Sequence, residues 1–282
     1  MKSIKRFFPA TLIQSAGPLS AVLSLIMAFG SGCTAPPPSA PPLRVGMAPD
    51  YPPLAFANAG QADGAEADFA RMLGAQLGRP VTFISLKWEQ LIPALQNGNI
   101  DIIMSGMSIT PTRQLSVAFS EPYLTNQLRA IFTRANAAQF KAPQDITNAP
   151  VRIGVMPGTT ADTLVQENCP QAERVALNTR PDAAFYLLQN PQIDVYIDDT
   201  FALAPILSTH EGSLTFMKAP LAENNLAWGV RPDNAELLRQ VNAVLTRAKS
   251  DGTVDRILTR WIPYLKQYES LLPDTSSGGQ AP

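Results

Sequence analysis

The stretch DIIMSGMSITPTR, residues 101–113, carries the strongest indication of the fold. In residues 101–104, an aspartate is followed by three apolar residues, which predicts a short strand. Thr110 and Pro111 predict the start of a helix, because Thr is a good N-cap and Pro fits the first helical position. A strand that runs through a turn into a helix is typical of α/β proteins, which bind ligands where such strands end.

The same alternation of strands and helices extends outward from this stretch. Phe69, Leu73 and Leu77 recur on one helix face, and Gly78 ends that helix. Further strands are predicted over residues 43–47, 81–86, 151–155, 194–197 and 226–230. Further helices are predicted over residues 89–97, 182–189, 234–250 and 253–264, after the turn at 157–160, and from about Thr200. This alternation indicates βαβ units, in which parallel sheets are covered by helices.

The composition excludes several classes of function. With 22 Lys and Arg against 23 Asp and Glu, the net charge is −1, so no basic excess is available to bind nucleic-acid phosphates. One His, His210, and two Cys, Cys33 and Cys169, cannot form a His-rich or Cys-rich zinc site. We therefore expect no metal, no cofactor and no nucleic-acid partner. The 282 residues suffice for one large domain or two ordinary ones.

The N-terminal residues predict a targeting segment. Three cations precede an apolar run at residues 19–29, which has the length of a signal-peptide core and is too short for a simple transmembrane helix. The sequence Gly30-Ser-Gly-Cys33 resembles the bacterial lipobox, although Gly30 stands where Leu is usual. We predict a lipoprotein signal peptide over residues 1–32 and lipid attachment at Cys33, which would hold the protein on a membrane. The alternatives are a transmembrane helix and a secretory signal with an unmodified Cys33.

Two segments flank the predicted body of the protein. Residues 33–42 include five prolines, favour polyproline II and predict a semi-rigid tether. Residues 270–282 are mostly small and polar and predict a disordered tail. The predicted strands and helices all lie between these two segments.

The loop after residues 101–104 carries groups that suit a carboxylate ligand. Gly106 lets a ligand approach the backbone, and Ser108 offers a hydroxyl group. Arg113 falls in the first turn of the predicted helix, where a cation opposes the helix dipole. One explanation is that the N-terminal amides of the helix and the guanidinium share an anion. The alternative is a surface arginine paired with an acid.

Other loops offer complementary groups. Asp198 and Asp199 follow a predicted strand, where they could cap the next helix or accept from an ammonium group. The turn that contains Thr159 and Thr160 offers backbone amides and two hydroxyls, or serves as a plain helix cap. Two aromatic side chains on loops could contact a ligand or fill the core: Tyr51 and Trp88.

A set of segments is specific in its order and spacing. The segments are LRVG (43–46), YPPLAF (51–56), GAEAD (64–68), WEQLIPALQNG (88–98), DIIMSGMSITPTR (101–113), FSEPY (119–123), GVMPGT (154–159) and DGTV (251–254). Through them the chain resembles the family 3 extracellular solute-binding proteins, the polar amino-acid receptors of ABC importers. The resemblance extends from Leu43 to Tyr264.

The resemblance implies an α/β fold of the periplasmic binding protein type II. Such a fold has two lobes, each a mostly parallel sheet flanked by helices, joined by a hinge with two crossovers. Lobe 1 then comprises residues 43–127 plus 226–269, and lobe 2 comprises residues 128–225. The crossovers fall near residues 125–127 and 224–225.

The resemblance also implies roles for the loop residues. In the family, the arginine that matches Arg113 clamps the ligand α-carboxylate, and the aspartate that matches Asp199 binds the α-ammonium. Because one lies on each lobe, only the closed state satisfies a zwitterion, and the ligand therefore favours closure. The other contacts that the family implies are backbone or hydroxyl bonds from Gly106, Ser108 and Thr159 and apolar contacts from Tyr51 and Trp88.

Side-chain selectivity is the point at which the sequence departs from family patterns. Ala48 stands where basic-amino-acid and glutamine receptors often have Asp, and Met156 stands where the glutamine type has Lys. Together with the two loop aromatics, these residues predict an apolar pocket and a ligand with an uncharged side chain. An approach of Asp50, Glu66 or Asp198 to the ligand side chain would change that preference.

The sequence therefore predicts a monomeric receptor without enzymatic activity, lipid-anchored outside the cytoplasm, that delivers an amino acid to an ABC permease in the cytoplasmic membrane. Two alternatives stay open. A few proteins of this resemblance are cyclohexadienyl dehydratases, in which Glu66 or Asp198 could serve as the proton donor. The other alternative is a ligand-sensing binding protein that signals to a membrane partner.

Overall fold

The computed structural model describes residues 40–265. The predicted signal peptide, the predicted lipid-attachment residue Cys33, residues 33–39 of the predicted tether and the predicted tail at 270–282 lie outside the described residues. Within the described part, no helix has both the length and the apolar character needed to cross a membrane.

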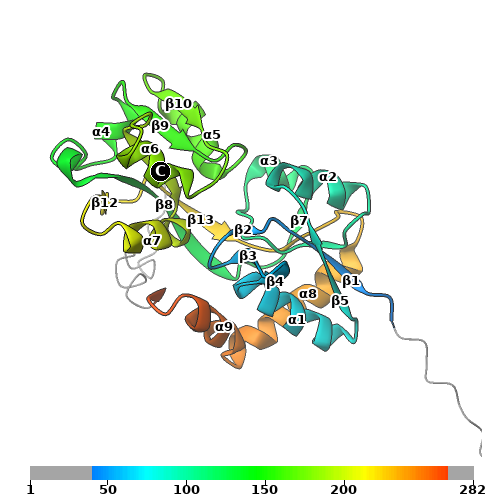
Figure 1. The fold of residues 1–282 in the computed structure, drawn as a ribbon. Coiled ribbons are helices and arrows are strands. Elements are labelled where there is room, and N and C mark those ends of the chain that lie inside the picture. Colours follow the sequence, from blue (N-terminus) through cyan, green and yellow to red (C-terminus); the bar gives the residue numbers. More distant parts are fainter. Residues whose placement is uncertain (1–39, 266–282) are drawn as a thin grey trace, which may run out of the picture. The chain divides into compact units, whose positions relative to one another are not determined.

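Five strands form the first sheet: β1 (Leu43–Met47), β5 (Val81–Ser85), β6 (Ile102–Ile103), β7 (Ala118–Phe119) and β14 (Gly229–Val230). Their order is β5-β1-β6-β14-β7 (Figure 1). β5, β1 and β6 are parallel, as predicted, whereas β14 is antiparallel to both of its neighbours. The sheet is mixed because β14 enters it from the second sheet, in the reverse direction.

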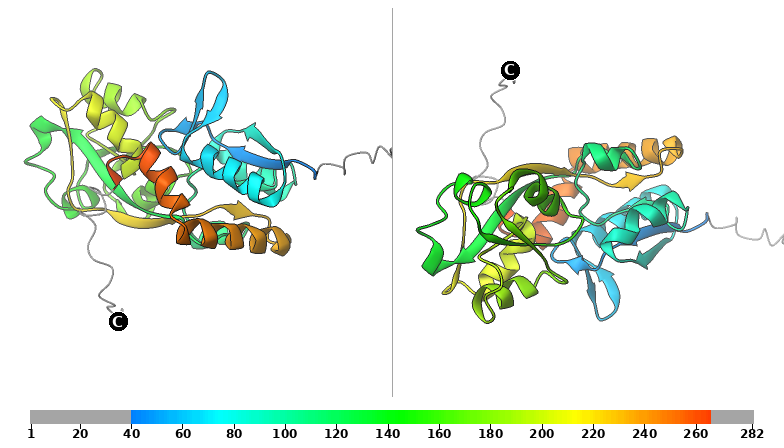
Figure 2. Two further views of the ribbon diagram at one scale, coloured as in Figure 1. Left: turned by 90° about the horizontal axis from the view of Figure 1, so that it is seen from below. Right: turned by 90° about the horizontal axis from the view of Figure 1, so that it is seen from above.

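Helices cover both faces of this sheet. One face carries α1 (Ala65–Leu77), α8 (Ala235–Ser250) and α9 (Thr253–Trp261), which pack against one another (Figure 1, Figure 2). The other face carries the short helices η1 (Trp88–Gln90) and α2 (Leu91–Gln96). Neighbouring residues of a strand point to opposite faces, so Ile102 packs in the core with Phe69 and Trp228, whereas Ile103 packs in the core with Leu95.

A small meander and a short helix follow strands of the first sheet. An antiparallel meander that the sequence did not predict precedes α1: β2 (Asp50–Tyr51), β3 (Ala55–Asn58) and β4 (Gln61–Asp63). Helix α3 (Pro111–Gln114) begins as predicted, with Thr110 Oγ1 accepting from the backbone N–H of Arg113 over 3.2 Å. The predicted N-cap is therefore confirmed.

Six strands form the second sheet: β8 (Leu124–Thr133), β9 (Arg152–Val155), β10 (Glu173–Ala176), β11 (Val195–Asp199), β12 (Leu214–Phe216) and β13 (Ala222–Leu226). β10, β9 and β11 are parallel, and β8 is antiparallel to β11, β12 and β13. The helices of this lobe are α4 (Gln144–Thr147), α5 (Thr160–Asn168), α6 (Asp182–Leu188) and α7 (Thr200–Thr209). In each sheet three strands pair in parallel, and one strand, β14 or β8, runs in the reverse direction and pairs antiparallel with its neighbours.

The two predicted crossovers lie side by side. In the pairing of β8 with β13, Thr125 lies opposite Asn225, and its Oγ1 donates to Asn225 Oδ1 over 2.9 Å. The prediction of one strand over 226–230 is wrong, because β13 ends at Leu226 in the second sheet and β14 begins at Gly229 in the first. The hinge is therefore a pair of hydrogen-bonded strands, and the lobe limits stay a prediction.

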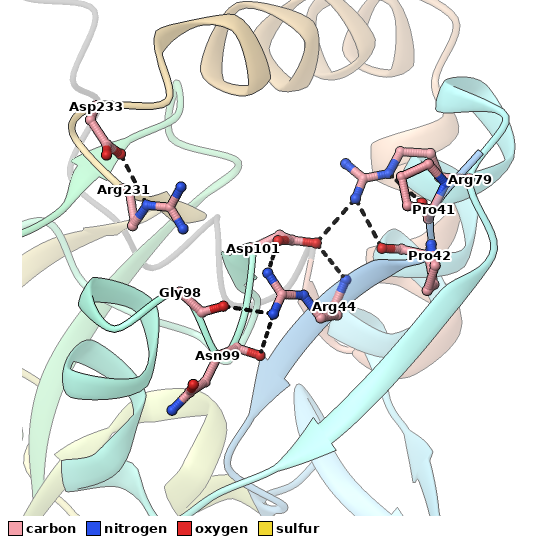
Figure 3. A network of polar contacts seen from close by, with 9 residues as sticks. All are labelled: Pro41, Pro42, Arg44, Arg79, Gly98, Asn99, Asp101, Arg231 and Asp233. Atoms are coloured by element: carbon pink, nitrogen blue, oxygen red, sulfur yellow. Dashed lines mark hydrogen bonds and ion pairs between the residues drawn. The ribbon is translucent and has the colours of Figure 1, made fainter.

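An ion-pair network fixes the chain where it enters β1 (Figure 3). Arg79 donates to the carbonyls of Pro41 and Pro42, both over 2.9 Å, and to Asp101 over 3.1 Å. Asp101 also accepts from the backbone N–H and the guanidinium of Arg44, over 3.0 and 2.5 Å. These contacts fix Pro41 and Pro42 beside the first sheet.

Candidate functional site

Asp199 ends β11 and is held by a side chain from the other lobe. The hydroxyl of Tyr51 in β2 donates to Asp199 Oδ2 over 2.7 Å, and both residues are buried. Asp199 Oδ1 is buried too, and no residue in the described part of the chain donates to it. Burial, followed by the charge of Asp198, raises the pKa of Asp199 to about 6. The amide of Asn126 acts in the opposite direction on this pKa, although its geometry falls short of a hydrogen bond. One carboxylate oxygen is thus committed to Tyr51, and the other can accept from a ligand.

Arg113 in α3 brings a cation to the same place. Its Nη1 donates to the carbonyl of Ser108 over 2.9 Å, and its Nη2 donates to the carbonyl of Gly158 over 3.1 Å. Burial lowers the pKa of Arg113, and the charge of Asp199 opposes that change. The alternative of a surface arginine paired with an acid therefore does not hold.

Two cavities share four of their lining residues. They differ in the others: charged groups line one cavity, and apolar groups line the other. The first is lined by Arg113 and Asp199, and the second by Ala48 and Met156. The structure places all the predicted ligand-binding residues at one or both of them: Tyr51, Trp88, Gly106, Ser108, Arg113, Met156, Thr159 and Asp199. Residues from both lobes thus meet where strands end.

The turn between Met156 and α5 serves as a helix cap as well as a cavity wall. Thr159 Oγ1 accepts from the backbone N–H of Asp162 over 3.3 Å and donates to the carbonyl of Met156 over 2.7 Å. The carbonyl of Gly158 accepts from Trp88 Nε1 over 3.0 Å, in addition to its bond from Arg113. A helix cap and a ligand contact are therefore both compatible with the structure of this turn, since the capping residue Thr159 also lines the cavities.

Glu66 lies behind the turn at Gly106 rather than beside a cavity. Its Oε1 accepts from the Gly106 N–H over 2.5 Å and from the Tyr123 hydroxyl over 2.7 Å, and its Oε2 accepts from Trp228 Nε1 over 2.9 Å. Burial raises the pKa of Glu66 to about 7, although these three hydrogen bonds act in the opposite direction. Glu66 lines neither cavity, so its role is to position the backbone of Gly106, which does line one.

Gly106 itself is fixed by its conformation and by Tyr51. Its φ is +66°, and a Cβ atom there would lie 2.7 Å from Tyr51 Cε1. We expect Gly106→Ala to lower the free energy of unfolding by about 1–3 kcal/mol, since it combines backbone strain with overpacking. Urea unfolding measures the loss. Gly60→Ala is the control, because Gly60 has φ +77° and open space around it. Equal losses in the two variants would contradict the role of the Tyr51 contact.

Arg180 is a site residue that the sequence analysis missed. Its guanidinium carbon lies 4.5 Å from the centroid of the Tyr51 ring, and its side chain lines both cavities. Its Nε donates to Asp198 Oδ2 over 2.9 Å, and its Nη1 donates to the Asp50 carbonyl over 3.1 Å. A signal was present, because Arg180 lies just before α6, and a cation near a helix start had already drawn attention to Arg113 in the first turn of α3.

Asp198 supports Arg180 and does not line either cavity. Besides the bond from Arg180, it accepts from the Tyr196 hydroxyl over 2.5 Å and from the backbone N–H of Asp199 over 2.8 Å. These bonds account for a buried carboxylate at this position.

The sequence matches a known protein family and several of its characterised members. The sequence model of bacterial extracellular solute-binding proteins, family 3, matches residues 43–264. The chain is 30% identical over 246 residues to ABC transporter arginine-binding protein 1 of Escherichia coli K12, covering 85% of this chain and 97% of that protein. It is 27% identical over 255 residues to the histidine-binding periplasmic protein of Salmonella typhimurium, covering 87% and 97%.

Solved structures agree with these relatives. An ancestral amino acid-binding protein, described as a precursor of cyclohexadienyl dehydratase, superposes with a TM-score of 0.71 at 33% identity, covering 78% of this chain and 94% of that one. A Wolinella succinogenes binding component of an ABC transporter, complexed with lysine, has a TM-score of 0.74 at 27% identity, covering 80% and 98%. The predicted two-lobed α/β fold is thereby confirmed.

Proposed function

Because the chain belongs to the bacterial extracellular solute-binding proteins of family 3, we propose that it captures an α-amino acid with an uncharged side chain and delivers it to an ABC permease. The observation that carries the proposal is that Arg113 and Asp199 line the same cavity. A zwitterion supplies a carboxylate for the first and an ammonium for the second.

The distribution of these charges over two lobes supports capture by closure. Arg113 lies in α3 beside the first sheet, and Asp199 ends a strand of the second sheet. Asp199 Oδ1 has no donor within residues 40–265, so an ammonium group would satisfy it. A ligand that contacts both charges stabilises only the state in which the lobes approach each other.

The lining of the second cavity favours an uncharged ligand side chain. Ala48 and Met156 are apolar, and the charges of Arg180 and Asp50, which also line this cavity, lie 3.5 Å apart and offset each other. A charged ligand side chain would be attracted by one of these two residues and repelled by the other. The relatives named for arginine and histidine make this selectivity the part of the proposal that most needs a test.

A thermal-shift screen over the twenty amino acids, followed by calorimetry, tests both parts of the proposal. We expect one or more amino acids with uncharged side chains to raise the melting temperature. The α-amide and the deaminated acid of the best ligand should bind much more weakly, because each lacks one of the two charges. Lysine or arginine as the best ligand would contradict the uncharged side chain. No response to any amino acid would contradict the receptor function itself.

We further propose that the protein is not an enzyme. The two carboxyls considered as proton donors are committed to other groups: Glu66 accepts from Gly106, Tyr123 and Trp228, and Asp198 accepts from Arg180, Tyr196 and Asp199. Incubation with prephenate should yield no phenylpyruvate above the uncatalysed rate. Its formation would favour the dehydratase alternative, to which the similarity with a dehydratase precursor draws attention.

The location of the receptor completes the proposal. We propose that it is a monomer, held outside the cytoplasm by a lipid on Cys33. Labelled palmitate should be incorporated into the wild type and not into Cys33→Ala. Labelling of both proteins alike would exclude Cys33 as the attachment point.

A further inference from the structure

We propose that Arg180 and Asp50 select a ligand whose side chain ends in a carboxamide, with Arg180 donating to the amide oxygen and Asp50 accepting from the amide nitrogen. This inference rests on the proposed function, since it concerns the side-chain end of the same amino-acid site. Arg180 was not predicted from the sequence, and Asp50 was named there only as an acid that could approach the ligand side chain.

Arg180 is held rigidly with donors to spare. Its side chain is 10% exposed, and it is fixed by Asp198 through Nε, by the Asp50 carbonyl through Nη1 and by the ring of Tyr51. A guanidinium has five N–H donors in a planar fork. Nη2 donates to none of the residues that the structure describes, while the side chain lines both cavities. A guanidinium donor that faces a cavity in this way can bond an acceptor of the ligand.

The charge of Arg180 is already compensated. Asp198 lies 2.9 Å from its Nε and is itself buried, and Asp50 Oδ1 lies 3.5 Å from its Nη1. The arginine therefore offers hydrogen-bond donors without an uncompensated positive charge. A neutral acceptor gains those bonds at no electrostatic cost, whereas an anionic group would face the Asp50 carboxylate.

Asp50 supplies the complementary acceptor. Its side chain is 45% exposed, and the residue lines the second cavity and an outer cleft of about 750 Å³. Its Oδ2 accepts no hydrogen bond from residues 40–265. A primary amide carries one acceptor and one donor group, which matches Arg180 and Asp50 together. A carboxylate matches only Arg180, a cation matches only Asp50, and an aliphatic group matches neither.

The two ends of the site are arranged for one extended ligand. Arg113 and Asp199 line the first cavity, and Arg180 extends from it into the second, where Asp50 lies. Tyr51 and Trp88 line both cavities, so their rings can cover an aliphatic stem between the α-carbon and the amide. Glutamine and asparagine are the amino acids with this chemistry.

Calorimetry on the full chain with glutamine, asparagine, glutamate, methionine and arginine tests the inference. We expect glutamine or asparagine to bind about tenfold or more tightly than the other three, since a hydrogen bond to a charged group distinguishes them. Asp50→Asn should lower the ratio of glutamine to glutamate affinity about tenfold, because it removes the repulsion of the carboxylate ligand. Asp50 is half-exposed, so this variant is expected to fold.

A double variant isolates Arg180. Arg180→Met with Asp198→Asn removes both members of the buried pair and leaves no unpaired charge. It should bring the affinities for the amide ligand and for methionine to within about threefold. The matched control is Arg152→Met with Asp194→Asn, an arginine–aspartate pair of the same lobe that lines neither cavity. The control should keep the wild-type preference.

The outcomes separate this inference from the proposed function. If amino acids bind but arginine, glutamate or methionine equals or exceeds the amides, the carboxamide assignment is overturned and the receptor function stands. An unchanged preference in both Asp50→Asn and the double variant also overturns it. If no amino acid binds the wild type, the proposed function fails and the inference with it.

Discussion

Replacing Arg113 by alanine is expected to weaken amino-acid binding by roughly thirty-fold to several-thousand-fold. The substitution removes one member of a desolvated pair and leaves the ligand carboxylate without its partner, which typically costs about 2–5 kcal/mol. The guanidinium of Arg113 donates only to the carbonyls of Ser108 and Gly158 among the described residues, so its loss leaves no buried carboxylate unpaired. The fold should therefore survive the substitution.

Isothermal calorimetry with the best ligand of the wild type measures this loss, and thermal unfolding without ligand verifies the fold. Arg239→Ala is the control, because Arg239 is 70% exposed on α8 and pairs with Glu236. That variant should bind like the wild type, since exposed ion pairs contribute little. An affinity of Arg113→Ala within threefold of the wild type would refute the assignment of Arg113 to the ligand carboxylate.

Elements whose sequence shows a clear period and a cap could be predicted. Helix α5 begins after Thr159, and α8 follows an asparagine cap at Asn234, because short polar side chains bond the free amides of the first turn. Strand β1 was predicted to the residue, since its apolar positions are bounded by a proline and a polar loop. These signals are local, so the surrounding fold does not alter them.

Strand β8 shows why other elements could not be predicted. Its ten residues include Asn126, Gln127 and Arg129, which are at most 2% exposed, so polar side chains occupy positions where a strand usually buries apolar ones. Their burial depends on strands from the other half of the sheet. β13 forms only by pairing with β8. The hinge therefore becomes visible only when distant segments are brought together.

The candidate site divides in the same way. Arg113, Ser108 and Gly106 lie in one continuous segment and could be recognised from its motif. Arg180 belongs to a loop without a motif, and its role depends on Asp50, which is 130 residues away in the sequence, and on Asp198 in β11. A contact between residues that are distant in the sequence cannot be recognised from the sequence around either of them.

The buried carboxyl of Glu66 is expected to make the protein less stable as the pH rises from about 4.5 to above 7. Its pKa is 4.5 in its ordinary state and about 7 in the folded protein, because burial disfavours the ionised form. In this interval the folded state holds a proton that the unfolded state has released, so the stability present below pH 4.5 is lost as the pH passes the folded pKa. The loss amounts to about 3 kcal/mol.

Urea unfolding of the wild type and Glu66→Gln at pH 4.5, 6 and 8 isolates this contribution. Asp199, whose pKa is also raised, contributes equally to both proteins and cancels in the comparison. The glutamine does not titrate, although its amide nitrogen must face one of the N–H or O–H donors around Glu66, so the variant should be less stable at pH 4.5. The difference in the free energy of unfolding between the wild type and Glu66→Gln should narrow by about 3 kcal/mol towards pH 8. A gap that stays constant over this range would show that Glu66 is already ionised in the folded state at pH 4.5, and that its three hydrogen bonds outweigh its burial.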